Sequence, residues 1–279
     1  MRRMAGGGEG SPAGLEICGV RKAFPDPKRP DGRLNVLDGI DLAVPAGRFF
    51  ALVGPSGSGK STLLDIVAGL VRPDAGTVHF SGAPIDGRPG TAAYMMQDDL
   101  LFPWQTIREH VALPLIVRGV RRREALRQAE ALLRDFGLGA FVDRYPSALS
   151  GGMRQRAALA RALVQGTALV LLDEPFGRLD ALTRASLQEW LEGVYRRERR
   201  TILMVTHDVE EALYLADRIV VFSPRPARVV DVVEVPFDRP RTRSLRADGA
   251  FVRLKAALLE RLLALLPEPG DRPASAPFR

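Results

Sequence analysis

A glycine-rich run, GPSGSGKST, occupies positions 54–62 and has the residue types that bind phosphate groups. Glycines let backbone amides approach phosphate oxygens, Lys60 supplies a cation, and the hydroxyl of Ser61 suits a magnesium ion. The apolar strand pattern FFALV precedes the run and the helical pattern STLLDIVAGL follows it, which disfavours a ligand-free turn. The predicted phosphate-binding residues are Gly54, Pro55, Ser56, Gly57, Ser58, Gly59, Lys60, Ser61 and Thr62.

Two adjacent carboxylates, Asp173 and Glu174, follow the apolar run ALVLL. Open α/β sheets bind ligands at the carboxyl ends of their strands, so we expect both side chains to face the phosphates. Asp173 suits a magnesium ion, largely through water, and Glu174 suits the orientation and deprotonation of an attacking water. A simple acidic turn is the alternative. With the phosphate loop alone, these carboxylates are compatible with a kinase, a GTPase or any other P-loop enzyme.

The run LSGGM at positions 149–153 resembles the signature of ATP-binding cassette (ABC) proteins, usually written LSGGQ. It is followed by RQRAALARAL and precedes the acidic strand, as the family's order requires. A Ser-Gly-Gly turn at a helix start offers free amides and a hydroxyl, which form an anion site. In the family this turn reaches the nucleotide of a second subunit. The resemblance therefore implies a homodimer in which Ser150, Gly151 and Gly152 contact the partner's ATP.

The remaining motifs of the ABC family occur in the expected order along the chain. Gln97 in YMMQDD resembles the Q-loop glutamine, Asp180 in GRLD the D-loop aspartate, and His207 in VTHD the switch histidine. Phe24 resembles the aromatic residue that stacks on adenine. The resemblance implies catalytic roles for Glu174, His207, Lys60 and Gln97, nucleotide contacts from Phe24 and Asp180, and magnesium binding by Ser61, Gln97 and Asp173, with ATP and Mg²⁺ as cofactors.

Each of these positions taken alone has a simpler interpretation. A single Gln97 is usually a surface amide, Asp180 a helix cap, His207 a structural histidine and Phe24 a core residue. Because these residues occur together and in the family's order, the functional interpretation is favoured. The resemblance covers residues 15–235. The chain departs from the family pattern at Met153, where Gln is usual, and within the D-loop at position 178, where Arg replaces Ala.

The surrounding patterns predict an α/β fold, namely a P-loop NTPase with a RecA-like core, an antiparallel β subdomain and a helical signature subdomain. We expect a flexible tail over 1–13, an ABC ATPase domain over 14–235 with its helical subdomain at about 98–154, and a C-terminal helical extension and tail over 236–279. An apolar spacing of three and four residues from Phe251 to Leu265 predicts an amphipathic helix, and docking on the core is its expected role.

Composition limits where the chain acts. It has 279 residues, a net charge of +7 and a single cysteine, Cys18, so a disulfide framework is excluded and a reducing cytoplasm fits best. The sequence has no signal-peptide pattern and no apolar stretch long enough to span a bilayer. The arginine clusters at 121–123 and 196–200 lack interleaved aromatic residues, so we expect no nucleic-acid partner.

The combination of LLFPW after Gln97 with LSGGMRQR resembles the ATPases of the nitrate, sulfonate and taurine importer branch. This resemblance implies a peripheral protein on the cytoplasmic face of the inner membrane. It would power uptake of a small solute through an integral-membrane permease, with an extracytoplasmic solute-binding protein as an indirect partner. Leu100, Leu101, Phe102 and Trp104 would contact the permease or, alternatively, belong to the core. Other possibilities are an exporter motor and a non-transport ABC ATPase acting on a nucleoprotein or another soluble partner.

Overall fold

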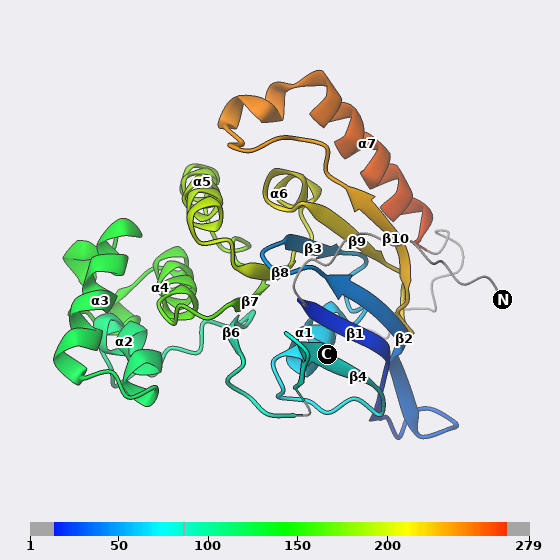
Figure 1. The fold of residues 1–279 in the computed structure, drawn as a ribbon, viewed down its shortest axis with the longest axis horizontal. Coiled ribbons are helices and arrows are strands. Elements are labelled where there is room, and N and C mark those ends of the chain that lie inside the picture. Colours follow the sequence, from blue (N-terminus) through cyan, green and yellow to red (C-terminus); the bar gives the residue numbers. More distant parts are fainter. Residues whose placement is uncertain (1–13, 86, 267–279) are drawn as a thin grey trace.

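The computed structural model describes residues 14–85 and 87–266. Two sheets and their helices form the larger part of the structure, and three helices, drawn in green in Figure 1, form a group that packs against one side of it. This architecture agrees with the predicted α/β fold. The predicted tail at 1–13 and the Pro-rich end at 267–279 lie outside the described residues, and the proposed domain boundaries stay predictions.

The larger sheet has six strands in the order β10-β9-β3-β8-β7-β6. Its strands are parallel except for β10, which pairs with β9 in the antiparallel direction. Every residue of β3, β7 and β8 is buried, as expected for strands covered on both faces. The strands are β3 (Phe49–Val53), β6 (Ala92–Met95), β7 (Leu169–Asp173), β8 (Thr201–Val205), β9 (Arg218–Phe222) and β10 (Val229–Glu234).

The smaller sheet is antiparallel and has the order β2-β1-β4-β5. The polar insert DPKRPDGR lies mostly in the turn between β1 and β2, so it lengthens a hairpin and leaves the pairing of Phe24 with Leu34 in place. A bridge joins Leu37 of the smaller sheet to Ala227, which lies between strands β9 and β10 of the larger sheet. The strands are β1 (Leu15–Pro25), β2 (Arg33–Val44), β4 (Ala75–Phe80) and β5 (Ala83–Pro84).

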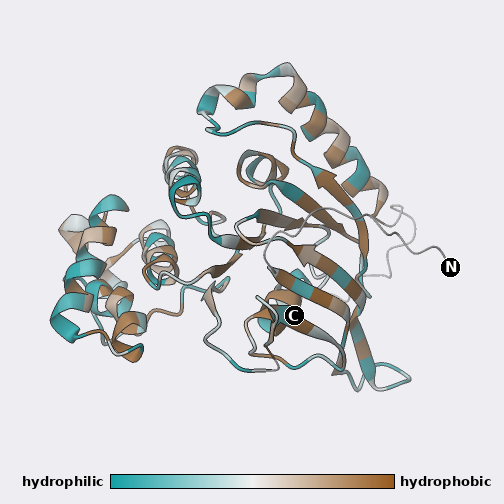
Figure 2. Cartoon of the chain, viewed as in Figure 1, coloured by the Kyte–Doolittle hydropathy of each residue, from teal (hydrophilic) through white to brown (hydrophobic). Residues whose placement is uncertain are grey.

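Strand β3 separates two hydrophobic cores because successive side chains of a strand point to opposite faces. Phe49, Ala51 and Val53 belong to a core shared with the helices, whereas Phe50 and Leu52 belong to a core between the two sheets. Figure 2 shows hydrophobic residues concentrated in these central strands. The carboxyl end of β3 is therefore fixed from both sides where the glycine-rich loop begins.

The helices fall into three groups. α1 lies between the sheets; α2, α3 and α4 form the group at one side; α5, α6 and α7 cover the remaining face of the larger sheet (Figure 1). No helix within 14–85 and 87–266 combines the length and the apolar character of a membrane span. The helices are α1 (Lys60–Val67), α2 (Ile107–Val117), α3 (Arg122–Asp135), α4 (Gly151–Leu163), α5 (Ala181–Glu198), α6 (Val209–Leu215) and α7 (Gly249–Ala264).

The expected C-terminal amphipathic helix is present as α7, and it docks on the core. Phe251 and Leu258 are buried, and Leu254, Leu262 and Leu265 pack against the same core from partly buried positions. Asp208 and Asp248 cap the starts of α6 and α7, since their carboxylates accept hydrogen bonds from the first backbone amides of each helix.

Buried His110 in α2 is expected to make the fold sensitive to acid. Its Nε2 accepts a hydrogen bond from the backbone amide of Phe102, and burial lowers its pKa to about 4. The unfolded chain binds a proton below its ordinary pKa of 6.5, whereas the folded chain binds it only near pH 4, so stability falls with pH across that window. His110→Gln should reduce this loss by up to about 3 kcal/mol. Urea unfolding of both proteins at pH 7 and pH 4 measures the difference, and equal losses would contradict the assignment.

Candidate active site

A cavity of about 480 Å³ opens beside the glycine-rich loop. It lies where the carboxyl ends of β3, β7 and β8 meet, because the chain leaves each of these neighbouring parallel strands toward the same edge. Ten residues predicted from the sequence line it together: Phe24, Ser56, Gly57, Gly59, Lys60, Ser61, Thr62, Gln97, Glu174 and His207.

The phosphate loop has the shape its sequence predicts. Gly59 adopts the left-handed conformation with φ 109°, and a β-carbon there would lie 2.7 Å from Cγ1 of Val36, so no larger residue fits. It precedes α1, whose first amides donate no hydrogen bond to a capping side chain. These amides and the positive end of the helix dipole point toward the cavity, which is an arrangement that binds anions.

The Lys60 ammonium is nearly buried and donates to the carbonyl oxygens of Gly54 and Pro55, both at 2.9 Å. Burial lowers the pKa of Lys60, and the carboxylates of Glu174 and Asp173 oppose this shift by favouring the charged form. The Lys60 side chain therefore places a positive charge beside the phosphate loop, close to the carboxylates of Asp173 and Glu174.

Asp173 is buried at the end of β7, and its Oδ1 has no hydrogen-bond partner among the described residues. Burial raises its pKa to about 6, and a hydrogen bond from the Ser61 hydroxyl opposes that shift. An unpartnered buried carboxylate oxygen beside a hydroxyl fits Mg²⁺, which takes one or two protein oxygens and completes its shell with water and phosphate. The described residues contain no cluster of three or more His, Cys, Asp or Glu side chains that could hold a metal alone.

Glu174 follows directly after Asp173 and turns the chain out of the sheet. Its φ of 48° is unusual for a residue other than glycine, and its backbone amide donates to the carbonyl of Val205 in β8 at 2.9 Å. Its Oε1 lies 3.4 Å from Nδ1 of His207, a largely exposed residue between β8 and α6. The carboxylate and the imidazole thus stand side by side at the cavity, where they could act on one water and one phosphate.

Phe24 and Gln97 reach the cavity from other elements. Phe24 lies in β1 of the antiparallel sheet and is 36% exposed, so its alternative as a core phenylalanine is wrong. The Lys22 ammonium lies 5.4 Å from the centre of its ring. Gln97 is exposed after β6, on the segment that leads into the helical group. Stacking on adenine and magnesium binding by these two residues remain predictions.

The signature residues lie elsewhere. Ser150 caps α4, and its hydroxyl accepts from the backbone amide of Met153 at 3.3 Å, while Gly151 and Gly152 form the first residues of the helix. Asp180 likewise caps α5 by accepting from the amide of Thr183. Within the described part of the chain, none of these signature and D-loop residues lines the cavity. Contact with the nucleotide of a second copy remains a prediction for them.

Two polar residues at the site were not predicted from the sequence. Gln155 in α4 is buried and bonds to the backbone on either side of the turn after Glu174. Arg225, in the loop after β9, lines the cavity, and its Nη2 lies 3.0 Å from where a β-carbon on Gly57 would stand. For Gln155, the only signal in the sequence is the run RQR after the signature. For Arg225, the sequence contains no pattern that indicates a role at the site.

Arg225 is expected to strengthen ATP binding. It forms no ion pair within the described residues, and its guanidinium stands over the phosphate loop, where a triphosphate carries negative charge. Because the side chain is exposed, we expect Arg225→Gln to weaken ATP binding by about three- to tenfold, with kcat nearly unchanged. Titration with a fluorescent ATP analogue measures the change. Arg228→Gln is the matched control, since Arg228 lies in the same loop but is paired with Asp38 of β2. Equal affinity in both variants would contradict the role of Arg225.

Comparison with known proteins gives consistent matches. The family model described as "ABC transporter" matches residues 37–177. An aliphatic sulfonates import ATP-binding protein of Pseudomonas savastanoi is 42% identical over 95% of this chain and 90% of its own length. A taurine import ATP-binding protein of Chromobacterium violaceum is 40% identical over 90% of this chain and 97% of its own.

Many proteins of known structure resemble this fold. One of them is MJ0796, described as a bacterial ABC transporter cassette and solved as a dimer. It has a TM-score of 0.73 and 27% identity, and the match covers 80% of this chain and all of that one. A second structure of the same cassette, in a post-hydrolysis state bound to ADP and Pi, matches with the same values.

Proposed function

The chain belongs to the ABC transporter family, and on that premise we propose that it is the ATP-hydrolysing subunit of an importer for a small sulfonate-, taurine- or nitrate-like solute. The single observation that carries the proposal is the meeting of Lys60, Glu174 and His207 in one cavity beside Asp173. It is supported by relatives that are named as import ATP-binding proteins and match this chain over most of its length.

Different residues of the cavity bind the nucleotide, hold the magnesium ion and activate the attacking water. The amides of the phosphate loop and Lys60 bind the β- and γ-phosphates, while Phe24 and Arg225 lie where the rest of the nucleotide extends. Ser61, Asp173 and Gln97 would hold Mg²⁺, which neutralises charge on the phosphate oxygens when bound. Glu174 accepts a proton from the water that attacks the γ-phosphorus, the bond to the β-phosphate oxygen breaks, and ADP and phosphate leave.

His207 faces the same phosphate. Its Nδ1 lies near the Glu174 carboxylate, so the imidazole is oriented beside the attacking water while its other nitrogen is available to the γ-phosphate. Loss of the γ-phosphate removes the charge that this histidine detects. Both groups stand at the ends of neighbouring parallel strands, so their spacing depends on the sheet and not on a long loop.

Two copies of the chain would complete each site. Ser150, Gly151 and Gly152 begin α4 outside their own cavity, so their amides and hydroxyl are available to the ATP of a second copy, with Asp180 in the adjoining D-loop. The dimeric state of the similar cassette supports this arrangement. ATP then holds the two copies together, and hydrolysis releases them.

The exposed segment after Gln97 is the proposed docking site for a membrane-embedded permease. Leu100, Phe102 and Trp104 are exposed, and the rings of the last two stack with centroids 5.1 Å apart, whereas Leu101 packs against the core. The alternative interpretation, that these residues belong to the hydrophobic core, is therefore correct in part, and only for Leu101. The chain would lie on the cytoplasmic face of the inner membrane and meet a solute-binding protein only through the permease.

Uptake by the source organism tests the solute class. A strain lacking this gene should take up a labelled sulfonate, taurine or nitrate at a reduced rate, and the wild-type gene should restore that rate. A gene encoding Glu174→Gln should not restore it, because ATP would bind without being hydrolysed. Unchanged uptake of all three solutes in the deletion strain would contradict this solute class while leaving ATP hydrolysis untouched.

A further inference from the structure

Gln155 stands between the signature and the residue proposed to activate water. It belongs to α4, five positions after the cap Ser150, and is only 5% exposed. Its Nε2 donates to the backbone carbonyl of Glu174 at 2.9 Å, and its Oε1 accepts from the backbone amide of Arg178 at 2.8 Å. One amide group therefore holds both ends of the turn that carries Glu174.

This turn needs outside support. Glu174 has φ 48°, a left-handed conformation that a side chain makes unfavourable, so neighbouring contacts must maintain it. On one side, β8 holds the turn through the bond from the Glu174 amide to the Val205 carbonyl. On the other side, Phe176 is fully buried, and Gln155 supplies the polar bonds. The direction of the Glu174 carboxylate thus depends on where α4 lies.

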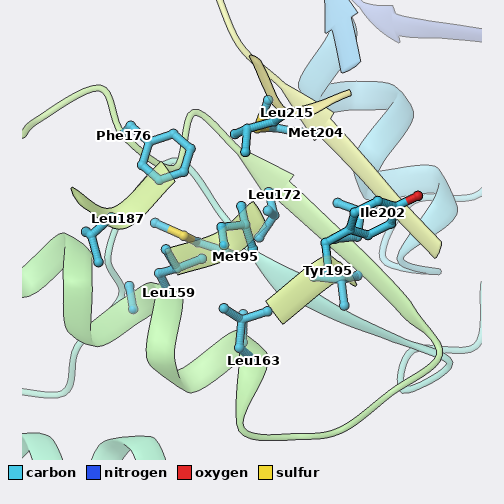
Figure 3. Packing of buried hydrophobic residues seen from close by; sticks show 14 of the residues in the cluster. Met95, Leu159, Leu163, Leu172, Phe176, Leu187, Tyr195, Ile202, Met204 and Leu215 are labelled. Carbon is cyan, nitrogen blue, oxygen red and sulfur yellow. The ribbon is translucent and has the colours of Figure 1, made fainter. Parts of the chain in front are cut away.

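α4 is also fixed to the sheet and to the segment after Gln97. Leu159 and Leu163 of α4 pack in the cluster that contains Phe176 (Figure 3). Arg154 binds Asp99 at 2.9 Å. Arg178, the unusual D-loop residue, pairs with Asp98 at 3.1 Å, but both side chains are exposed, so this pair contributes less than the buried amide.

We propose that Gln155 is a positioning residue that couples the signature helix to hydrolysis at Glu174. The inference rests on the proposed function, in which Ser150 contacts the ATP of the partner copy. Movement of α4 when Ser150 engages that ATP is then passed through Gln155 to the turn that orients Glu174 in its own site. Each copy would sense the partner's nucleotide through this single buried amide.

Two substitutions separate positioning from simple packing. Gln155→Met keeps the volume and removes both hydrogen bonds. Gln155→Glu keeps the acceptor for the Arg178 amide, loses the donor to the Glu174 carbonyl, and remains a test where the methionine variant does not fold. Gln188→Met is the matched control, because Gln188 is equally buried in α5 and bonds to Arg246, away from the cavity.

Steady-state phosphate release and equilibrium titration with a fluorescent ATP analogue give the readout. A misplaced carboxylate should lower kcat by about ten- to a hundredfold in both Gln155 variants and leave the dissociation constant for ATP within about threefold. Gln188→Met should match the wild type in both values. A kcat near that of the wild type in both Gln155 variants, or a parallel loss of binding, would overturn the inference while the ATPase stands. A wild-type protein without turnover would overturn the proposed function and this inference together.

Discussion

Replacing Glu174 with glutamine should lower ATP turnover by about a thousandfold, because a positioned general base contributes on the order of 10²–10⁴ to such a reaction. The glutamine keeps the size of the side chain but cannot accept the proton of the attacking water. ATP binding should remain, since Lys60 and the loop amides are unchanged. Steady-state phosphate release measures the turnover.

The same variant should accumulate as a dimer. Without hydrolysis, saturating ATP keeps the two copies closed, and static light scattering should report twice the mass of one chain. Glu198→Gln is the control, because Glu198 ends α5 outside the cavity. It should hydrolyse ATP as the wild type does. A Glu174→Gln protein that stays monomeric with ATP would count against the two-copy scheme, and one that turns over normally would remove Glu174 from the mechanism.

Replacing Lys60 with alanine should abolish useful ATP binding. The ammonium is nearly buried within the phosphate loop, where few water molecules compete with it for the phosphates. Removing one partner of such a charge pair costs about 3 kcal/mol, which corresponds to a roughly hundredfold rise in the dissociation constant. Isothermal titration with ATP and Mg²⁺ measures it.

A lysine outside the cavity controls for the loss of charge itself. Lys255 in α7 forms an ion pair with Glu210, and Lys255→Ala should bind ATP with wild-type affinity. Equal affinity in Lys60→Ala and the wild type would mean that the loop does not bind phosphate through its lysine. An equal loss of ATP affinity in both variants would instead indicate that the net charge of the protein determines binding.

The sequence was most informative where function requires neighbouring residues in a fixed order. The loop at 54–62 could be recognised because glycines, a lysine and hydroxyls must be adjacent to surround phosphates. Strands β3 and β7 were visible as apolar runs because parallel strands are buried on both faces. The carboxylates of Asp173 and Glu174 could then be assigned to the same sheet edge.

Contacts between distant segments were not visible in the same way. Gln155 bonds to backbone groups, which every residue has, so no residue type at 174 or 178 marks the contact. Arg225 reaches the cavity because β9 lies beside β3, and that order of strands cannot be derived from local patterns. His110 is buried against the amide of Phe102, although a lone histidine in a helix is usually an ordinary polar residue.

Capture of the tagged chain from gently solubilised native membranes tests whether this ATPase drives a membrane importer. Mass spectrometry then identifies the proteins that co-purify. We expect a multi-span permease, and less of it with Trp104→Ala, because Trp104 is 69% exposed on the proposed docking segment. Leu182→Ala, at an even more exposed apolar position in α5, should leave recovery unchanged. Recovery of ribosomes or DNA-repair proteins in place of a permease would contradict the importer and leave an ATPase with a different partner.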